Sequence, residues 1–306
     1  MRLLDIATEF ADLNIFNQDT YDTVVGKTKV FCERAGVVTI CDIDFTVLAN
    51  FKKLTLSTSK PITYNGYIRY LRIIVDYAIE RGYASKNLFR EIKLAPEGSP
   101  PPKIMEGDTI KELCDQIAGK KAKYGESDFW LTVVTCLFYT GMRRRQLVSL
   151  RLRDINFELK TITLSYEGSK TKRSWSIPVH VELASKLEKF VYLNEEVLGR
   201  KMQSEDFLFV ASRFNPRYAV TAEGGMRRDA ITGFFKRLGK TIEKGVGANR
   251  FRHTFATDLC NPNDDTPPDI FSVQAMLGHT SINTTRRYVQ TSVRRMGSTL
   301  SRRAEL

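Results

Sequence analysis

The chain has 306 residues and is 42% hydrophobic, which is enough to form two domains with separate cores. Lys and Arg total 47 against 35 Asp and Glu, and this formal net charge of +12 favours a polyanionic partner, with nucleic acid the first candidate. Asp5 and Glu9 interrupt the opening stretch where a signal peptide would be apolar, and no run of apolar residues is long enough to span a membrane. We therefore expect a cytoplasmic protein with no membrane partner, associated with the nucleoid when it binds DNA.

The five cysteines are widely spaced and lie mostly among apolar neighbours, so we expect reduced thiols and no disulfide framework. The sequence contains no CxxC pair and no cluster of His and Cys at metal-ligand spacing. We accordingly expect no metal site and no cofactor.

Residues 1–94 are predicted to form a helical domain. Apolar residues recur at helical spacing, most clearly from Tyr67 to Ala78, and Gly82 fits the end of that helix. On its other face, Arg69 and Arg72 are three residues apart and are candidate DNA contacts, although a solvated surface is the commoner role for each arginine alone. Because this domain starts near residue 1, we expect no further DNA-binding domain before it.

Residues 95–103, APEGSPPPK, are predicted to be a linker, because three consecutive prolines cannot continue a helix. A second domain is then expected at 104–291, with helices at Asp108–Ile117 and Phe129–Tyr139. The runs Thr161–Tyr166 and Ser174–Val179 alternate and are rich in β-formers, so they predict a hairpin. The predicted fold class is therefore mainly α with a small β-sheet.

Basic residues gather around that hairpin and after the helix that precedes it. Lys170 and Lys172 lie at the hairpin tip, with Arg173 beside them, and Arg144 lies in a run of three arginines. Solvated side chains are the usual role of such groups, and contact with DNA is the alternative that we carry forward. The tail 292–306 has Val293, Met296 and Leu300 at helical spacing, together with two Arg pairs, so we expect it to be disordered or to dock on another surface.

Four motifs then occur in order along the second domain. They are Thr140-Gly141-Met142-Arg143, Gly168-Ser169-Lys170-Thr171, the run from Phe251 to Thr257 that contains Arg252 and His253, and Leu277-Gly278-His279 with Tyr288 downstream. Each motif is weak when taken alone. Together the chain resembles the tyrosine recombinase (phage integrase) family, with a two-domain, Xer/Cre-like organisation. The resemblance implies a SAM-like helical core-binding domain at 1–94 and an α+β catalytic domain.

The resemblance also implies a set of catalytic roles. Arg143 and Arg252 match the two arginines that stabilise charge on the scissile phosphate, which a guanidinium contacts in bidentate geometry. Tyr288 matches the nucleophile that forms a 3′-phosphotyrosine intermediate, and Lys170 matches the general acid for the departing 5′-oxygen. His279 matches a residue that hydrogen-bonds the phosphate.

Two positions depart from the family pattern. Asn249 stands where a histidine is common, and an amide donates a hydrogen bond but takes no proton, so we expect it to position the phosphate. Gln146 replaces a frequent acidic residue. His253 is expected to be structural. Two alternatives stay open: a type IB topoisomerase-like enzyme, and a site-specific DNA-binding protein with impaired catalysis.

The resemblance implies partners as well. Double-stranded DNA is the expected substrate, and a homotetramer on two sites is the expected assembly. Accessory proteins that bend DNA or set direction are further expected partners, and integration or excision of a mobile element or phage is the expected biological reaction.

Overall fold

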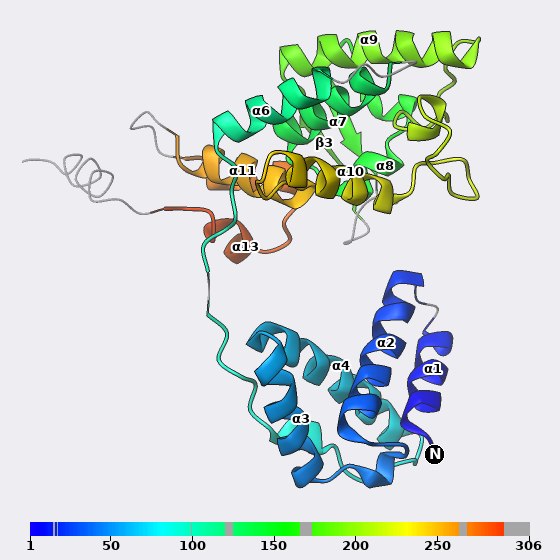
Figure 1. The fold of residues 1–306 in the computed structure, drawn as a ribbon, viewed down its shortest axis with the longest axis vertical. Coiled ribbons are helices and arrows are strands. Elements are labelled where there is room, and N and C mark those ends of the chain that lie inside the picture. The colour runs from blue at the N-terminus through cyan, green and yellow to red at the C-terminus, as the bar shows by residue number, and fades with distance from the viewer. Residues whose placement is uncertain are drawn as a thin grey trace, which may run out of the picture. The chain divides into compact units, whose positions relative to one another are not determined.

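The computed structural model describes residues 1–14, 16, 18–98, 100–119, 125–165, 173–262 and 268–290. The chain divides into two compact units, Met1–Pro100 and Pro101–Leu306, drawn in blue to cyan and in cyan-green to red (Figure 1). Helices dominate both units and one small sheet lies in the second, which confirms the fold class expected from the sequence. Each unit has its own hydrophobic core.

The first unit is built from helices and has no β-strand among its described residues. Its helices are α1 (Leu3–Leu13), α2 (Gln18–Ala35), η1 (Ile40–Asp42), α3 (Phe45–Thr58), α4 (Pro61–Glu80) and α5 (Leu88–Glu91). The core is built on aromatic rings, in which Phe31 contacts Phe51 and Phe89 at centroid distances of 4.8 and 5.3 Å. α4 packs against α1, α2, α3 and α5, so it is the central helix of this unit.

The first residues of the expected linker are fixed to α4. Asn65 is buried, its amide nitrogen donates to the Ala95 carbonyl and its amide oxygen accepts from the Ala95 N–H, both at 2.8 Å. Glu97 Oε1 accepts from the same Asn65 nitrogen at 2.7 Å and from Arg69 at 2.8 Å. These bonds hold 95–97 against the helical unit, so the chain leaves the unit later than composition predicts.

The second unit holds the sheet and the remaining helices. Its elements are α6 (Gly107–Ala118), α7 (Glu126–Thr140), α8 (Arg144–Ser149), η3 (Leu152–Asp154), β1 (Ile155–Asn156), β2 (Thr161–Leu164), β3 (Trp175–Pro178), α9 (Val181–Leu198), η4 (Ala211–Arg213), α10 (Arg228–Thr241), α11 (Ala248–Cys260), α12 (Ile270–Leu277) and α13 (Ile282–Arg286).

Apolar α7 lies at the centre of this second unit. It packs against α6, α9 and α11, and most of its residues are buried, as its continuous hydrophobicity predicts. The sheet is antiparallel in the order β1-β2-β3, with Ile162 paired to Ile155 and to Ile177. Ile162, Leu164 and Ile177 are buried in the same core, so the two strands predicted from alternation form the pair β2 and β3.

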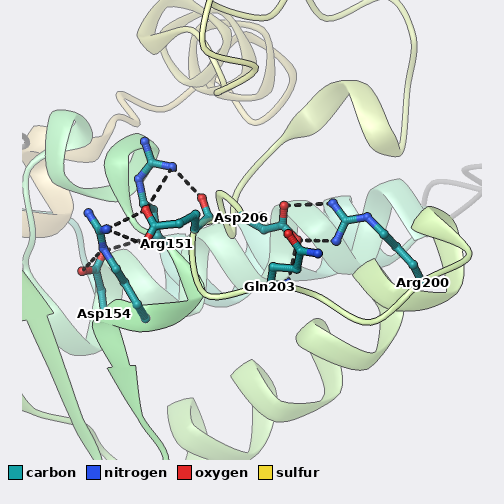
Figure 2. A network of polar contacts seen from close by, with 7 residues as sticks. Arg151, Asp154, Arg200, Gln203 and Asp206 are labelled. Carbon is teal, nitrogen blue, oxygen red and sulfur yellow. Dashed lines mark hydrogen bonds and ion pairs between the residues drawn. The ribbon is translucent and has the colours of Figure 1, made fainter.

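A polar network fixes the segment between α9 and η4 beside the sheet (Figure 2). The Asp206 carboxylate accepts from both terminal nitrogens of Arg200 at 2.6 and 2.9 Å and from the Gln203 N–H at 2.8 Å. These donors lower the pKa of Asp206 to about 2. Arg151 donates to the Glu205 carbonyl at 2.5 Å, and its own N–H donates to Asp154 at 2.8 Å. The loop is thereby held at the start of β1.

One tight contact joins the sheet to the C-terminal helices. Trp175 of β3 donates its indole N–H to the Met276 carbonyl at 3.1 Å, and its ring covers Gly278, which ends α12 with φ of +60°. A Cβ at Gly278 would lie 2.3 Å from the ring. Only glycine allows both this backbone conformation and this approach, so the pair sets where β3 meets the end of α12.

Gly278→Ala is expected to destabilise the second unit more than Gly199→Ala does. Both glycines end helices with positive φ, +60° and +65°, so both variants carry the left-handed penalty of about 1–2 kcal/mol. Gly199 has no atom within 4 Å of its would-be Cβ, so only Gly278→Ala also displaces a ring. Chemical denaturation of the two variants measures the difference, and equal losses of stability would show that the Trp175 contact is dispensable.

Candidate active site

The turn between α7 and α8 places Arg143. α7 ends at Gly141, whose φ is +57° and whose would-be Cβ lies 2.5 Å from the Phe255 ring. Arg143 follows as the residue before α8, and its N–H donates to Gln146 Oε1 at 2.8 Å. Gln146 is buried, so the position that departs from the family pattern caps α8 here. The half-buried Arg143 guanidinium reaches the Leu277 carbonyl at 3.5 Å.

Arg252 of α11 is the most enclosed cation of the site. Its side chain is 7% exposed and donates to the Gly141 carbonyl at 2.9 Å and to the Leu277 carbonyl at 2.8 Å. Burial, followed by repulsion from Arg143, lowers the pKa of Arg252 to about 9. The guanidinium therefore keeps its charge at neutral pH while joining the α7–α8 turn to the end of α12.

His279 follows Gly278, and its ring position is set by two hydrogen bonds. Nε2 lies 3.0 Å from Arg252 Nη2, and Nδ1 lies 2.8 Å from Thr285 Oγ1. A guanidinium only donates, so Nε2 accepts and the ring proton resides on Nδ1, which donates to Thr285. Burial, Arg252 and then Arg143 lower the pKa of His279 to about 4, so the ring is neutral near pH 7.

Tyr288 is 7% exposed and follows α13. Asn261 holds its backbone: the amide nitrogen donates to the Tyr288 carbonyl at 2.8 Å and the amide oxygen accepts from the Gln290 N–H at 2.8 Å. The phenol oxygen lies 2.9 Å from His253 Nδ1. Burial raises the pKa of Tyr288, while Arg252, Arg287 and Arg143 act in the opposite direction.

The structure thus brings four of the expected catalytic residues into one place. Arg143 and Arg252 both reach the Leu277 carbonyl, Arg252 contacts His279, and the rings of His279 and Tyr288 are parallel with centroids 6.3 Å apart. Two guanidinium groups beside a phenol form a site for an anion, with a nucleophile next to it. This arrangement can support phosphoryl transfer, because charge that develops on phosphate oxygens would meet fixed cations.

Of the two other expected catalytic residues, the structure describes Asn249. Asn249 is exposed in the first turn of α11, and its side chain makes no hydrogen bond among the described residues. Lys170 and Lys172 lie outside the described residues. Arg173, at the start of the described segment before β3, is exposed.

The remaining expected DNA contacts already have partners in the protein. Arg144 donates to the Thr232 hydroxyl. Arg69 donates to Glu97 at 2.8 Å, so part of its charge is neutralised. Arg72 donates through Nε to the Phe89 carbonyl at 2.8 Å and through Nη2 to the Ile92 carbonyl at 2.7 Å. The structure therefore gives Arg72 a role in joining α4 to α5 that the sequence did not indicate.

Sequence reasoning missed three side chains that contact the site residues: His253, Thr285 and Asn261. His253 was expected to be structural, yet its ring contacts the phenol of Tyr288. Thr285 is fully buried against His279. The histidine directly after Arg252 was the one sequence signal for a contact of this kind. The contacts of Thr285 and Asn261 depend on tertiary packing, so nothing in the sequence indicated them.

Within the described ranges, no group of three or more His, Cys, Asp and Glu is placed to hold a metal ion. Over the same part of the chain, no helix is both long and apolar enough to cross a membrane.

Comparison with known proteins identifies the family. The model of the phage integrase family matches residues 103–295, which is more than half of the chain, so the chain belongs to the phage integrase family. The tyrosine recombinase XerD of Listeria monocytogenes is 27% identical over 230 residues, covering 75% of this chain and 72% of that protein. XerC-type tyrosine recombinases of Pseudomonas aeruginosa and Pseudomonas syringae are 24% and 23% identical, and the chain spans only 66% and 65% of their lengths.

Solved structures share the fold. The Tn1549 transposon integrase, solved in complex with transposon right end DNA, aligns with a TM-score of 0.76 at 17% identity, covering 99% of both chains. A lambda integrase dimer bound to a COC′ core site aligns with a TM-score of 0.70 at 17% identity, covering 99% of this chain and 78% of that one.

The two imidazoles of the site are expected to be opposite tautomers near neutral pH. The proton of His279 resides on Nδ1, and that of His253 on Nε2, because His253 Nδ1 accepts from the buried hydroxyl of Tyr288. Nitrogen NMR of labelled rings distinguishes the two forms, and identical tautomers would contradict the hydrogen-bond assignment.

The pKa of His279 is lowered from 6.5 to about 4, so between these values the unfolded chain binds a proton that the folded one does not. Stability conferred by this residue is therefore complete above pH 6.5 and is lost as pH falls toward 4.

Proposed function

We propose that this protein is a site-specific DNA recombinase that cuts and rejoins DNA through a 3′-phosphotyrosine at Tyr288. The observation that carries the proposal is the convergence of Arg143, Arg252 and His279 around a buried phenol. A phosphodiester is the anion that matches this set, because the guanidiniums would contact its nonbridging oxygens while the phenol attacks the phosphorus. Membership of the phage integrase family supports the same reaction and does not favour a topoisomerase.

In the proposed reaction, Tyr288 Oη forms a bond to the scissile phosphorus and the bond from phosphorus to the 5′-oxygen breaks. Lys170 supplies the proton for the departing oxygen, and Asn249 positions the phosphate. The phosphotyrosine keeps the energy of the broken bond, so a free 5′-hydroxyl of another strand reverses the step and rejoins DNA. Neither a metal ion nor ATP has a step in this sequence.

Double-stranded DNA is the proposed substrate, and a homotetramer on two sites is the proposed assembly. Support comes from neighbours in the same fold, among them the Tn1549 integrase bound to transposon right end DNA and a lambda integrase tetramer bound to a Holliday junction. The same proposal includes a helical core-binding domain at 1–94 and a catalytic domain at 104–291. It also includes accessory directionality proteins as partners and a location on the nucleoid. The tail 292–306 is proposed to dock on a neighbouring subunit.

Tyr288→Phe is expected to abolish covalent attachment to DNA while leaving binding intact, because only the attacking oxygen is removed. Duplexes recovered from a random-sequence library by binding to Tyr288→Phe are nicked and mixed with wild type, and the adduct is measured by denaturing electrophoresis. Tyr192→Phe is the matched control, since Tyr192 is 61% exposed on α9.

Arg252→Lys is expected to slow adduct formation by roughly 10²–10³-fold.

An adduct that survives Tyr288→Phe would move the nucleophile to another residue. Wild-type protein that binds the recovered duplexes but never attaches to any nicked form would instead show a DNA-binding protein without strand transfer.

Arg173→Ala is expected to reduce the salt dependence of DNA binding, whereas Arg72→Ala is expected to leave it unchanged. Each lost phosphate contact lowers the slope of log affinity against log salt by about one. Arg173 is exposed, while Arg72 already holds two carbonyl groups in the first unit. Affinities of both variants are measured over a salt series, and a reduced slope for Arg72→Ala would assign it to the DNA interface after all.

A further inference from the structure

We infer that His253 is a catalytic residue of the recombinase reaction, whose Nδ1 takes the phenolic proton of Tyr288 as the tyrosine attacks phosphorus. The inference rests on the proposed function and assigns the base for that reaction. His253 and Arg252 are adjacent on α11 but point to different partners: Arg252 to the Gly141 and Leu277 carbonyls, His253 to the Tyr288 hydroxyl. One helix turn therefore serves both the phosphate and the nucleophile.

The direction of the hydrogen bond follows from the burial of the phenol. Tyr288 is 7% exposed, and its hydroxyl hydrogen needs an acceptor to avoid the cost of an unpaired buried donor. Among the described residues, His253 Nδ1 at 2.9 Å is the acceptor that the hydroxyl has. The phenol accordingly donates, Nδ1 presents its lone pair, and the ring proton of His253 resides on Nε2. This is the state that a general base requires before reaction.

His279 and Asn249 are the alternative acceptors for the phenolic proton of Tyr288, and neither can take it. His279 has Nε2 occupied by Arg252 and Nδ1 bonded to Thr285, so neither nitrogen is directed at the phenol oxygen. Asn249 is exposed and carries an amide, which binds no proton near neutral pH. The base that the family pattern would place at 249 is thus missing, while an imidazole four positions further along the helix already contacts the nucleophile.

The charges around His253 favour its neutral form before DNA binds. Burial lowers its pKa, and Arg252, Arg287 and Arg250 lower it further, so the lone pair is available at neutral pH. The ring of Tyr288 also lies beside the imidazole of His253, with centroids 5.7 Å apart. A scissile phosphate brings negative charge beside these arginines, and this charge would stabilise the imidazolium that forms during the step.

The step balances in atoms and charge. A lone pair of Tyr288 Oη forms the bond to phosphorus, the bond to the 5′-oxygen breaks, and the phenolic proton moves to His253 Nδ1. The 5′-oxygen leaves with a proton from a separate acid. In the rejoining direction the 5′-hydroxyl attacks phosphorus, and the His253 imidazolium returns its proton to the departing phenolate.

His253→Asn is the variant that separates proton transfer from positioning. An Asn amide oxygen can occupy the place of Nδ1 and accept from the phenol, but it takes no proton. With the nicked duplexes described above, adduct formation by His253→Asn is expected to be slower than wild type by roughly 10²–10⁴-fold. The matched control is His180→Asn, because His180 stacks on Tyr139 at the start of α9, away from these contacts.

The pH profile is the readout that a purely structural role would not move. In wild type the rate is expected to fall as pH drops through a pKa below 6.5, where His253 gains its proton, and this fall is expected to vanish in His253→Asn. A duplex with sulfur in place of the bridging 5′-oxygen supplies a leaving group that needs no acid. The His253→Asn defect is expected to persist on it, because the defect concerns the attacking oxygen.

Wild-type rate and pH profile in His253→Asn would overturn the inference, as would full rescue by the sulfur-containing duplex. Both results leave the proposed function intact, since wild type still forms the adduct and Tyr288→Phe does not. Failure of wild type to form any adduct would instead reject the proposed function. Unchanged DNA affinity and unfolding transition of His253→Asn verify that the variant is folded.

Discussion

The buried guanidinium of Arg252 is the contact on which the site depends. It holds the carbonyl of Gly141, at the end of α7, and the carbonyl of Leu277, at the end of α12, and it also donates to His279. Arg252 therefore joins its own helix α11 to two segments far away in sequence, the turn after α7 and the end of α12. A lysine presents its three donors from a single nitrogen, whereas these bonds leave from two nitrogens of a planar fork, so the choice of arginine follows from geometry as well as charge.

Small residues allow these segments to come close. Gly141 lies under the ring of Phe255 from α11, and Gly278 lies under the ring of Trp175 from β3. Each glycine ends a helix in the left-handed conformation, so each both stops its helix and admits a ring. The residues that follow these turns, Arg143 and His279, are presented to the site as a result. The two glycines that end these helices therefore determine the geometry of the site as much as its functional side chains do.

The sequence predicted much of this arrangement, since helical periodicity and local motifs depend on neighbours in the chain. The buried α7 and the strands β2 and β3 follow from such patterns, while the grouping of Arg143, Arg252, His279 and Tyr288 was implied by the resemblance to the family. The His253 contact could not be predicted in this way, because it joins residues 35 positions apart through packing. Periodicity likewise placed Arg72 on an outer face, while its guanidinium turns back to the carbonyls of Phe89 and Ile92.

The side-chain amide of Asn261 fixes the position of Tyr288 relative to α11. It binds the carbonyls of Thr257 and Tyr288 and the N–H of Gln290, so Tyr288 is anchored to the same helix that carries Arg252 and His253. These contacts lie within one chain, so Tyr288 needs no neighbouring molecule to bring it beside Arg252 and His253. Under the proposed function, any order of cleavage among the subunits of an assembly would then be set by restraining chains whose tyrosine is already in place.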